Sequence, residues 1–187
     1  MNRYLFRRNN LDDGGILRLF RDGDPAAHRI LYDKYSALLY AVCLRYVSEE
    51  MAAEDVLQES FIAIFDRIGS FEERGKGSLK AWMVRIAVNL CLKHLRNTSR
   101  FRFEELETAE IPNEPETESL GPDLLMGFIR SLPDGYRAVF NMFVIEGMSH
   151  KEIAGILGIT ESTSASQLHR AKARLARIIN NYREENK

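Results

Sequence analysis

Lysines and arginines in this chain are concentrated in two stretches whose chemistry suits the binding of phosphates. Residues 74–102 hold eight basic side chains and no acidic one. These are Arg74, Lys76, Lys80, Arg85, Lys93, Arg96, Arg100 and Arg102. Residues 170–183 hold five more, again without an acid. Cations without intervening carboxylates can neutralise the backbone of a nucleic acid, so both stretches are candidate nucleic-acid contacts.

Carboxylates dominate residues 49–73, where eight acids accompany one arginine. Five residues of the helix predicted there share the face opposite its apolar stripe, namely Asp55, Gln58, Glu59, Ile62 and Asp66. An isoleucine among carboxylates is typical of a protein-contact surface, and a solvated acidic face is the alternative. Asp55 and Glu59 alone supply too few ligands for a metal ion. The sequence therefore predicts no metal, no cofactor and no catalytic residue.

A helix-turn-helix is predicted near the end of the chain. Ser149 and Glu152 have the spacing of a capping box, and Gly158 supplies the left-handed residue that a sharp turn needs. Thr160 can cap a second helix, whose basic later turns and small polar first turns suit a recognition helix. Its inward stripe is Leu168, Ala171, Leu175 and Ile178. Ser164 lies where such motifs usually bury an aliphatic residue, and a helical hairpin with a solvated basic face is the alternative.

Three upstream helices are predicted to position the acidic face and the first basic stretch. Asp24 with Pro25 predicts the start of the first, Ser48 starts the second, Gly69 ends it, and Ser78 caps the third. Apolar residues recur at the spacing of a buried helix face. The stripes are Ile30, Leu31, Tyr35, Leu38, Leu39 and Val42, then Ala53, Val56, Leu57, Ser60, Phe61, Ile64, Phe65 and Ile68, then Leu79, Trp82, Met83, Ile86 and Leu90. Trp82 is therefore expected in the core, opposite a polar face of Arg85, Asn89, Lys93 and Arg96.

Length and composition allow one domain or two small ones, and an acidic stretch in the chain indicates two. The chain has 187 residues, 45% of them hydrophobic, and a net charge of -1. The stretch 104–122 is acidic, contains prolines and has few apolar residues, so it is predicted to be a flexible linker between domains 1–103 and 123–187. Cys43 and Cys91 lie in separate apolar stretches, which predicts buried thiols in a reducing cytoplasm. The apolar run 37–44 is too short to cross a membrane.

Three blocks of the sequence resemble conserved regions of one family. AEDVLQESFIAIFDRI and GSLKAWMVRIAVNLCLKHLR resemble the second region of sigma-70 family sigma factors. LPDGYRAVFNMFVIEGMSHKEIAGILGITESTSASQLHRAKARL resembles the fourth region, and a short linker replaces the third, as in the extracytoplasmic-function group. The resemblance implies an all-α fold and a protein that is not an enzyme. It would bind core RNA polymerase, recognise the minus-35 and minus-10 promoter elements and promote DNA opening.

The resemblance also assigns roles to particular residues. The acidic face Asp55, Gln58, Glu59, Ile62 and Asp66 would bind the clamp coiled coil of the polymerase largest catalytic subunit. The minus-10 contacts would be Arg74, Lys76, Lys80, Arg85, Asn89, Lys93 and Arg96, with an unstacked base received by the loop 71–77. The minus-35 contacts would be Ser162, Ala165, Ser166, Gln167, His169, Arg170, Lys172 and Arg174. Among these, Gln167 and Arg170 are the two able to make a bidentate base contact.

The expected partners are core RNA polymerase, promoter DNA and an anti-sigma factor, with no membrane insertion and no small-molecule substrate. A flexible linker of 19 residues reaches roughly 25 Å, whereas promoter elements two helical turns apart are separated by about 70 Å. The polymerase is therefore expected to hold both domains. Two alternatives are a polymerase-independent helix-turn-helix regulator and a protein-interaction module that does not contact DNA.

Overall fold

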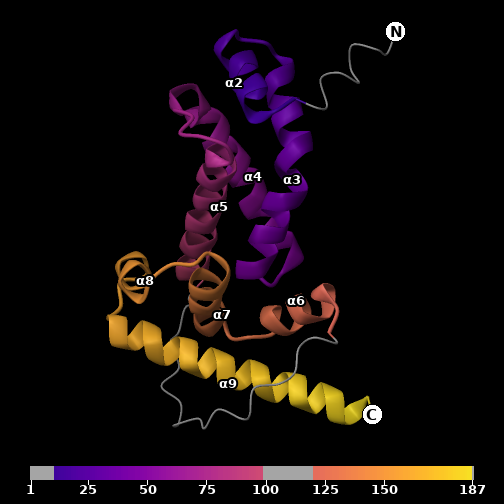
Figure 1. Ribbon diagram of the computed structural model, residues 1–187, viewed down its shortest axis with the longest axis vertical. Coiled ribbons are helices and arrows are strands. Elements are labelled where there is room, and N and C mark those ends of the chain that lie inside the picture. The colour runs from indigo at the N-terminus through magenta and orange to yellow at the C-terminus, as the bar shows by residue number, and fades with distance from the viewer. Residues whose placement is uncertain (1–10, 99–119, 187) are drawn as a thin grey trace. The chain divides into compact units, whose positions relative to one another are not determined.

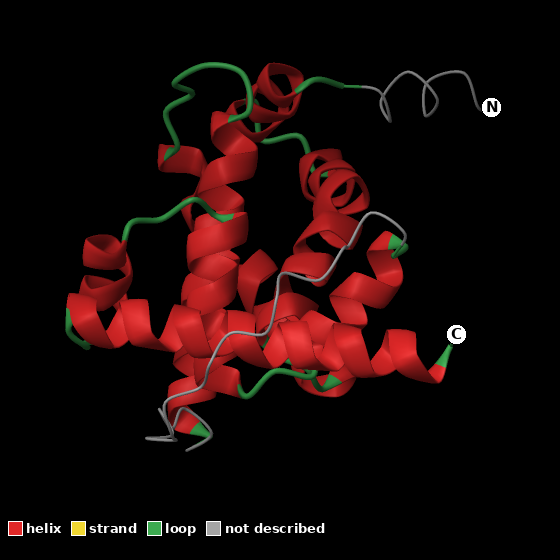
Figure 2. Cartoon of the chain, turned by 60° about the horizontal axis from the view of Figure 1, so that its bottom comes forward, coloured by secondary structure: helices red, strands yellow, loops and turns green. Residues whose placement is uncertain are grey.

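A computed structural model describes residues 11–98 and 120–186. In these ranges the chain forms helices joined by loops and no strand, which confirms the predicted all-α class (Figure 2). The described residues divide into two compact units, a first of 11–44 and 49–94 and a second of 45–48, 95–98 and 120–186. The predicted linker 104–122 lies outside the described residues except for its last three positions.

Four α-helices and one 3-10 turn carry the first unit (Figure 1). They are α2 (Asp13–Arg21), α3 (Ala26–Tyr46), α4 (Glu50–Arg67), η1 (Ile68–Ser70) and α5 (Ser78–Asn97). The Asp12 carboxylate accepts a hydrogen bond from the Gly15 amide and starts α2. Asp24 does the same for the Ala26 amide at 2.9 Å, so the predicted cap of α3 is confirmed.

The predicted apolar stripes form the core of the first unit. On α3 and α4 every stripe residue is buried except Leu38 and Phe65, which are half-buried. Cys43 and Cys91 are fully buried thiols, as predicted. Ser60 is also buried, and its hydroxyl donates to the Val56 carbonyl at 2.7 Å, which satisfies the one polar group of the stripe.

Two predicted helix starts are wrong by one or two residues. The residue at the cap position of α4 is Glu49, so Ser48 does not cap this helix. Ser78 is itself the first residue of α5, and its hydroxyl accepts from the Arg74 amide at 3.1 Å. The serine therefore closes the loop before α5 instead of capping the helix. At the other end of α4, Gly69 lies inside η1, two residues beyond the last α-helical residue, Arg67.

A polar cluster fastens α2 to α3. The Asp13 carboxylate accepts hydrogen bonds from Lys34 Nζ at 2.7 Å and from the Tyr35 hydroxyl at 2.5 Å. Burial by itself raises the pKa of Asp13, but the bonds from Lys34 and Tyr35 outweigh burial and leave the pKa below its usual value. Burial, and then the bond to Asp13, raise the pKa of the Tyr35 hydroxyl well above its usual value.

The second unit contains α6 (Pro122–Arg130), α7 (Asp134–Phe140), the π-helical turn η2 (Asn141–Ile145), α8 (His150–Leu157) and α9 (Glu161–Glu185). Arg137 is 2% exposed and fastens the turn between α6 and α7. Its guanidinium donates to the Arg130 carbonyl at 2.9 Å and the Leu132 carbonyl at 2.7 Å, and forms an ion pair with Asp134. Burial lowers the pKa of Arg137, and the Asp134 carboxylate opposes this shift.

The helix-turn-helix has the local geometry that the sequence predicts. Ser149 and Glu152 form a complete capping box at the start of α8. Gly158 ends α8 in the left-handed conformation, with φ 70° and ψ 34°. The Thr160 hydroxyl accepts from the Thr163 amide at 3.0 Å and caps α9. These caps fix where both helices begin and end.

Ser164 fills the position where such motifs usually bury an aliphatic residue. It is fully buried, and its hydroxyl lies 3.0 Å from Nδ1 of His150. The His150 ring stacks on Phe143, with centroids 4.5 Å apart and an interplanar angle of 22°. A hydrogen-bonded serine and a stacked imidazole therefore take the place of a purely apolar contact between α8 and α9.

Candidate nucleic-acid interface

The polar face of α5 is exposed as predicted. Arg85, Asn89, Lys93 and Arg96 all lie at the surface. With a rise of 1.5 Å per residue, the eleven steps from Arg85 to Arg96 span roughly 16 Å. Consecutive phosphates of one DNA strand are about 3.4 Å apart along the axis, so this face can follow several nucleotides of a single strand. Lys80 on α5 and Arg74 and Lys76 on the preceding loop are also exposed.

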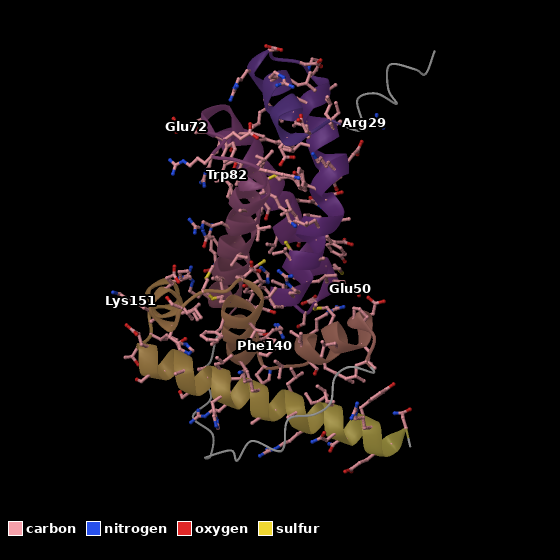
Figure 3. All side chains as sticks on the ribbon, in the orientation of Figure 1. Arg29, Glu50, Glu72, Trp82, Phe140 and Lys151 are labelled. Atoms are coloured by element: carbon pink, nitrogen blue, oxygen red, sulfur yellow. The ribbon has the colours of Figure 1, made fainter. Side chains whose placement is uncertain are left out.

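A cavity of about 620 Å³ opens where the loop after η1 meets the start of α5. It is lined by Arg67, Ser70, Phe71, Glu72, Arg74, Ser78, Ala81, Trp82 and Arg85. The rings of Phe71 and Trp82 lie with centroids 5.0 Å apart at an interplanar angle of 41°. Figure 3 labels Trp82 near the start of α5 and Glu72 in the loop before it.

The predictions for two residues of α5 are corrected by this cavity. Trp82 was expected in the core, but its side chain is half-buried and forms part of the cavity wall. Arg85 was expected on the face opposite Trp82, but both residues line the same cavity. The physical reason is that residues three positions apart are neighbours on a helix surface. Leu90 is half-buried at the margin of the stripe.

The composition of the cavity suits a nucleobase. Two aromatic rings offer faces for stacking, which is worth about 1–3 kcal/mol per base in single-strand binding proteins. Arg67, Arg74 and Arg85 supply cations for the flanking phosphates, and Glu72 supplies a carboxylate acceptor for an exocyclic amine. The loop 71–77 was expected to receive an unstacked base, and the structure adds Trp82 and Arg67 to the residues that would surround it.

The acidic face of α4 is exposed over its full length. Asp55, Gln58, Glu59, Ile62 and Asp66 all lie at the surface, and Ile62 is 62% exposed. A large aliphatic side chain that is mostly exposed among carboxylates has the character of a protein-binding surface. The structure therefore brings the five predicted residues onto one accessible face.

The recognition helix α9 places seven of its eight predicted contact residues at or near the surface. Exposed side chains are Ser162, Ala165, Ser166, His169, Lys172 and Arg174, and Arg170 is half-buried. The Ser162 hydroxyl bonds the Thr160 hydroxyl at 2.9 Å, and the Ser166 hydroxyl donates to the Thr163 carbonyl at 2.9 Å. Each serine oxygen is thus held near the start of the helix, where a base edge can be approached.

Gln167 does not lie on the exposed face where the sequence analysis placed it, and its role in reading a base stays a prediction. Its side chain is only 2% exposed. Ser164, Gln167, Leu168 and Ala171 are all buried, and their spacing of three, one and three residues is that of one inward helix face. Gln167 lies four positions before Ala171 of the predicted inward stripe, and this spacing would have identified it as an inward residue. Arg170 remains as the candidate for a bidentate base contact.

The described residues contain no group of three or more histidine, cysteine, aspartate or glutamate side chains placed to hold a metal ion. Among the helices in the described ranges, none has the length and apolar character needed to cross a membrane.

Two models of protein families match the chain. The model for Sigma-70 region 2 matches residues 31–101, and the model for Sigma-70, region 4 matches residues 123–175. The ECF RNA polymerase sigma-E factor of Salmonella typhimurium is 30% identical over 178 residues, which cover 87% of this chain and 91% of that protein. Region 2 followed by region 4 defines the class as a sigma factor of the sigma-70 type. The chain belongs to the extracytoplasmic-function (ECF) group of the sigma-70 family.

Two other relatives are longer than this chain. The ECF sigma factors BldN of Streptomyces coelicolor and SigE of Mycolicibacterium smegmatis are each 32% identical, over 84% and 78% of this chain. The chain spans 62% of BldN and 58% of SigE. A solved structure of the sigma factor RpoE with the anti-sigma factor NepR from Bartonella quintana matches at 22% identity and a TM-score of 0.49, covering 83% of this chain and 98% of that one. Membership of the sigma factor family agrees with the prediction that the protein is not an enzyme.

Proposed function

We propose that this protein binds core RNA polymerase, recognises minus-35 and minus-10 promoter elements and promotes DNA opening at the start of transcription. The observation that carries the proposal is the aromatic cavity of Phe71 and Trp82, which continues into the exposed basic face of α5. A surface for one DNA strand that ends in a space for a base suits a protein that holds DNA after its strands separate.

The minus-10 role is assigned to the loop before α5 and to α5 itself. Arg85, Asn89, Lys93 and Arg96 would follow the separated strand, with Arg74, Lys76 and Lys80 near its start. Each lost stacking step of the duplex costs about 1.4 kcal/mol. Stacking of one base on Phe71 and Trp82 would return about 1–3 kcal/mol. Capture of a single base therefore offsets the cost of unstacking it and shifts the opening equilibrium toward the open state.

The minus-35 role is assigned to α9. Ser162, Ser166, His169 and Arg170 would approach base edges in the major groove, while Lys172 and Arg174 would contact phosphates. Ala165 can offer only an apolar contact, such as one to a thymine methyl group. Because Gln167 is buried, the polar readout of this helix is carried by fewer residues than the sequence indicated.

The polymerase contact is assigned to the acidic face of α4, by the family resemblance and by the exposure of Ile62 among carboxylates. We also propose a cytoplasmic location, an anti-sigma factor that covers these surfaces, and domains 1–103 and 123–187 joined by residues 104–122. Since that linker is too short to span the two promoter elements when relaxed, the polymerase would hold both domains, and the free protein would bind promoter duplex poorly.

The test is transcription with purified core polymerase on a genomic library, followed by promoter opening assays on the promoters it identifies. Trp82→Ala should reduce the opening equilibrium constant about tenfold, a loss of about 1.4 kcal/mol, whereas Trp82→Phe keeps an aromatic face and should stay near the unsubstituted protein. On a template with the minus-10 bases already unpaired, most of the Trp82→Ala defect should disappear.

The proposal would be abandoned if the protein neither bound core polymerase nor changed where transcripts begin. Tight, specific binding of promoter duplex by the free chain at physiological salt, with no effect on the polymerase, would instead identify a polymerase-independent regulator. If Trp82→Ala had an equal defect on duplex and on unpaired templates, Trp82 would have no role in the opening of the DNA.

A further inference from the structure

A second cavity lies between α3 and α4, away from the basic face of α5. Its volume is about 410 Å³, within the range of about 300–1,000 Å³ that is usual for ligand pockets. It is lined by Tyr32, Ser36, Ala37 and Tyr40 from α3 and by Glu54, Leu57 and Gln58 from α4. We call this space the tyrosine cavity. All of its lining residues belong to the first unit.

The spacing of residues along α3 accounts for the cavity. Tyr32, Ser36 and Tyr40 follow one another at intervals of four, so they share one helix face. The small side chain of Ser36 leaves a space between the two rings. Tyr32 is 43% exposed, and its ring is supported from behind by buried Phe61, with centroids 4.6 Å apart. The tyrosine wall is therefore accessible and held in place.

The chemistry of the walls favours a guanidinium group. Aromatic faces attract cations, and the flat guanidinium of arginine both stacks on a ring and forms paired hydrogen bonds with a carboxylate. The tyrosine cavity offers tyrosine rings and the exposed Glu54 carboxylate together. No lysine or arginine is among the described residues that line it. An incoming cation is therefore attracted by the walls and meets no positive side chain among these lining residues.

The position of the cavity identifies the partner that would supply the cation. Gln58 lines the tyrosine cavity and also belongs to the acidic face assigned to polymerase binding. Glu54 is the residue directly before Asp55 of that face. We propose that the tyrosine cavity receives an arginine side chain from the polymerase surface that docks on α4. This inference rests on the proposed function, and it adds an anchor on α3 to a contact otherwise assigned to α4.

The test measures affinity for core polymerase in the full chain. Glu54→Gln keeps the shape of the side chain and removes its charge, and should raise Kd about tenfold. Tyr32→Leu should raise Kd about fivefold, whereas Tyr32→Phe keeps the ring and its contact with Phe61 and should change Kd less than about twofold. Asp22→Asn is the matched control, because Asp22 is an exposed carboxylate of the same unit outside the cavity. Its Kd should not change.

A photoreactive p-benzoylphenylalanine in place of Tyr32 identifies the partner directly. Cross-linking to core polymerase followed by mass spectrometry should recover a polymerase peptide that contains arginine. Replacing that arginine by lysine in the polymerase should weaken its binding to the unsubstituted protein about tenfold. The same replacement should leave its binding to the Glu54→Gln variant almost unchanged. A cross-linked peptide without arginine would overturn the inference, and so would unchanged binding by Glu54→Gln and Tyr32→Leu when both are folded. If the unsubstituted chain itself fails to bind polymerase, the proposed function fails first.

Discussion

Two glycines of α8 offer a pair of matched substitutions with opposite expected effects. Gly158 ends the helix with φ 70°, whereas Gly155 lies within the helix, three positions earlier. A Cβ added at either glycine would meet no described atom within 4 Å. Substitution by alanine therefore changes backbone preference at both positions without a steric clash at either.

The expected magnitudes follow from that difference. An alanine in the left-handed conformation costs about 1–2 kcal/mol, so Gly158→Ala should destabilise the turn between α8 and α9 by that amount. Alanine within a helix is better than glycine by about 0.5–1 kcal/mol, so Gly155→Ala should stabilise α8. The two variants should therefore differ by about 1.5–3 kcal/mol.

Hydrogen exchange read by mass spectrometry is the suitable assay, because it gives opening free energies for separate segments of one chain. Peptides that cover α8 and the first turns of α9 should exchange faster in Gly158→Ala and slower in Gly155→Ala. The single tryptophan, Trp82, lies in the first unit, so its fluorescence serves as an internal control that should not change.

The reasoning would be refuted if the two alanines shifted exchange in the same direction or by the same amount. Such a result would mean that Gly158 does not hold the left-handed conformation in the folded chain, since both sites are otherwise open to a Cβ. In promoter assays Gly158→Ala should also weaken minus-35 contact, because the turn sets the angle of α9, and Gly155→Ala should not.

Three further substitutions test the energetics of the fold. Arg137→Met should destabilise the second unit by about 3 kcal/mol in urea unfolding. The substitution leaves the Arg130 and Leu132 carbonyls and the Asp134 carboxylate without their buried partner. A loss below about 1 kcal/mol would contradict this. The pKa of Asp13 is lower in the folded chain than in the unfolded chain, so Asp13 stabilises the fold above about pH 4 and this stabilisation is lost as the pH falls through the folded pKa. Asp13→Asn should therefore reduce the loss of stability at acid pH in unfolding measurements. An unchanged dependence of stability on pH would count against this. Ser164→Ala should cost about 1 kcal/mol by removing the hydrogen bond to His150, and hydrogen exchange near α8 that matched the unsubstituted protein would show the bond to be dispensable.

Local sequence signals were enough to predict the helix-turn-helix. The capping box of Ser149 and Glu152, the left-handed Gly158 and the Thr160 cap depend on residues within four positions of one another, and each is present. The buried stripes of α3 and α4 follow in the same way from periodicity. These features could be predicted because backbone caps and helix faces are set by short-range spacing.

The cavities could not be predicted from spacing. Trp82 satisfies the periodicity of a buried stripe, but it lines a cavity together with Phe71, which a loop brings beside it. Gln167 differs, because its spacing of four from Ala171 already places it on the inward face of α9, and only its polar side chain suggested the surface. The tyrosine cavity arises only when α3 and α4 pack against each other. For both cavities the deciding contact joins residues whose meeting is set by tertiary packing.

The reactivity of the two thiols can measure how fast the first unit opens. Cys43 and Cys91 are completely shielded, and both belong to the first unit. A thiol reagent should therefore modify the folded chain only as fast as that unit opens. Since the sequence contains no other cysteine, the labelling rate reports the unfolding of the unit that carries the cavity of Phe71 and Trp82 and the acidic face of α4. Promoter DNA or polymerase that stabilises this unit should slow the reaction in proportion to its binding.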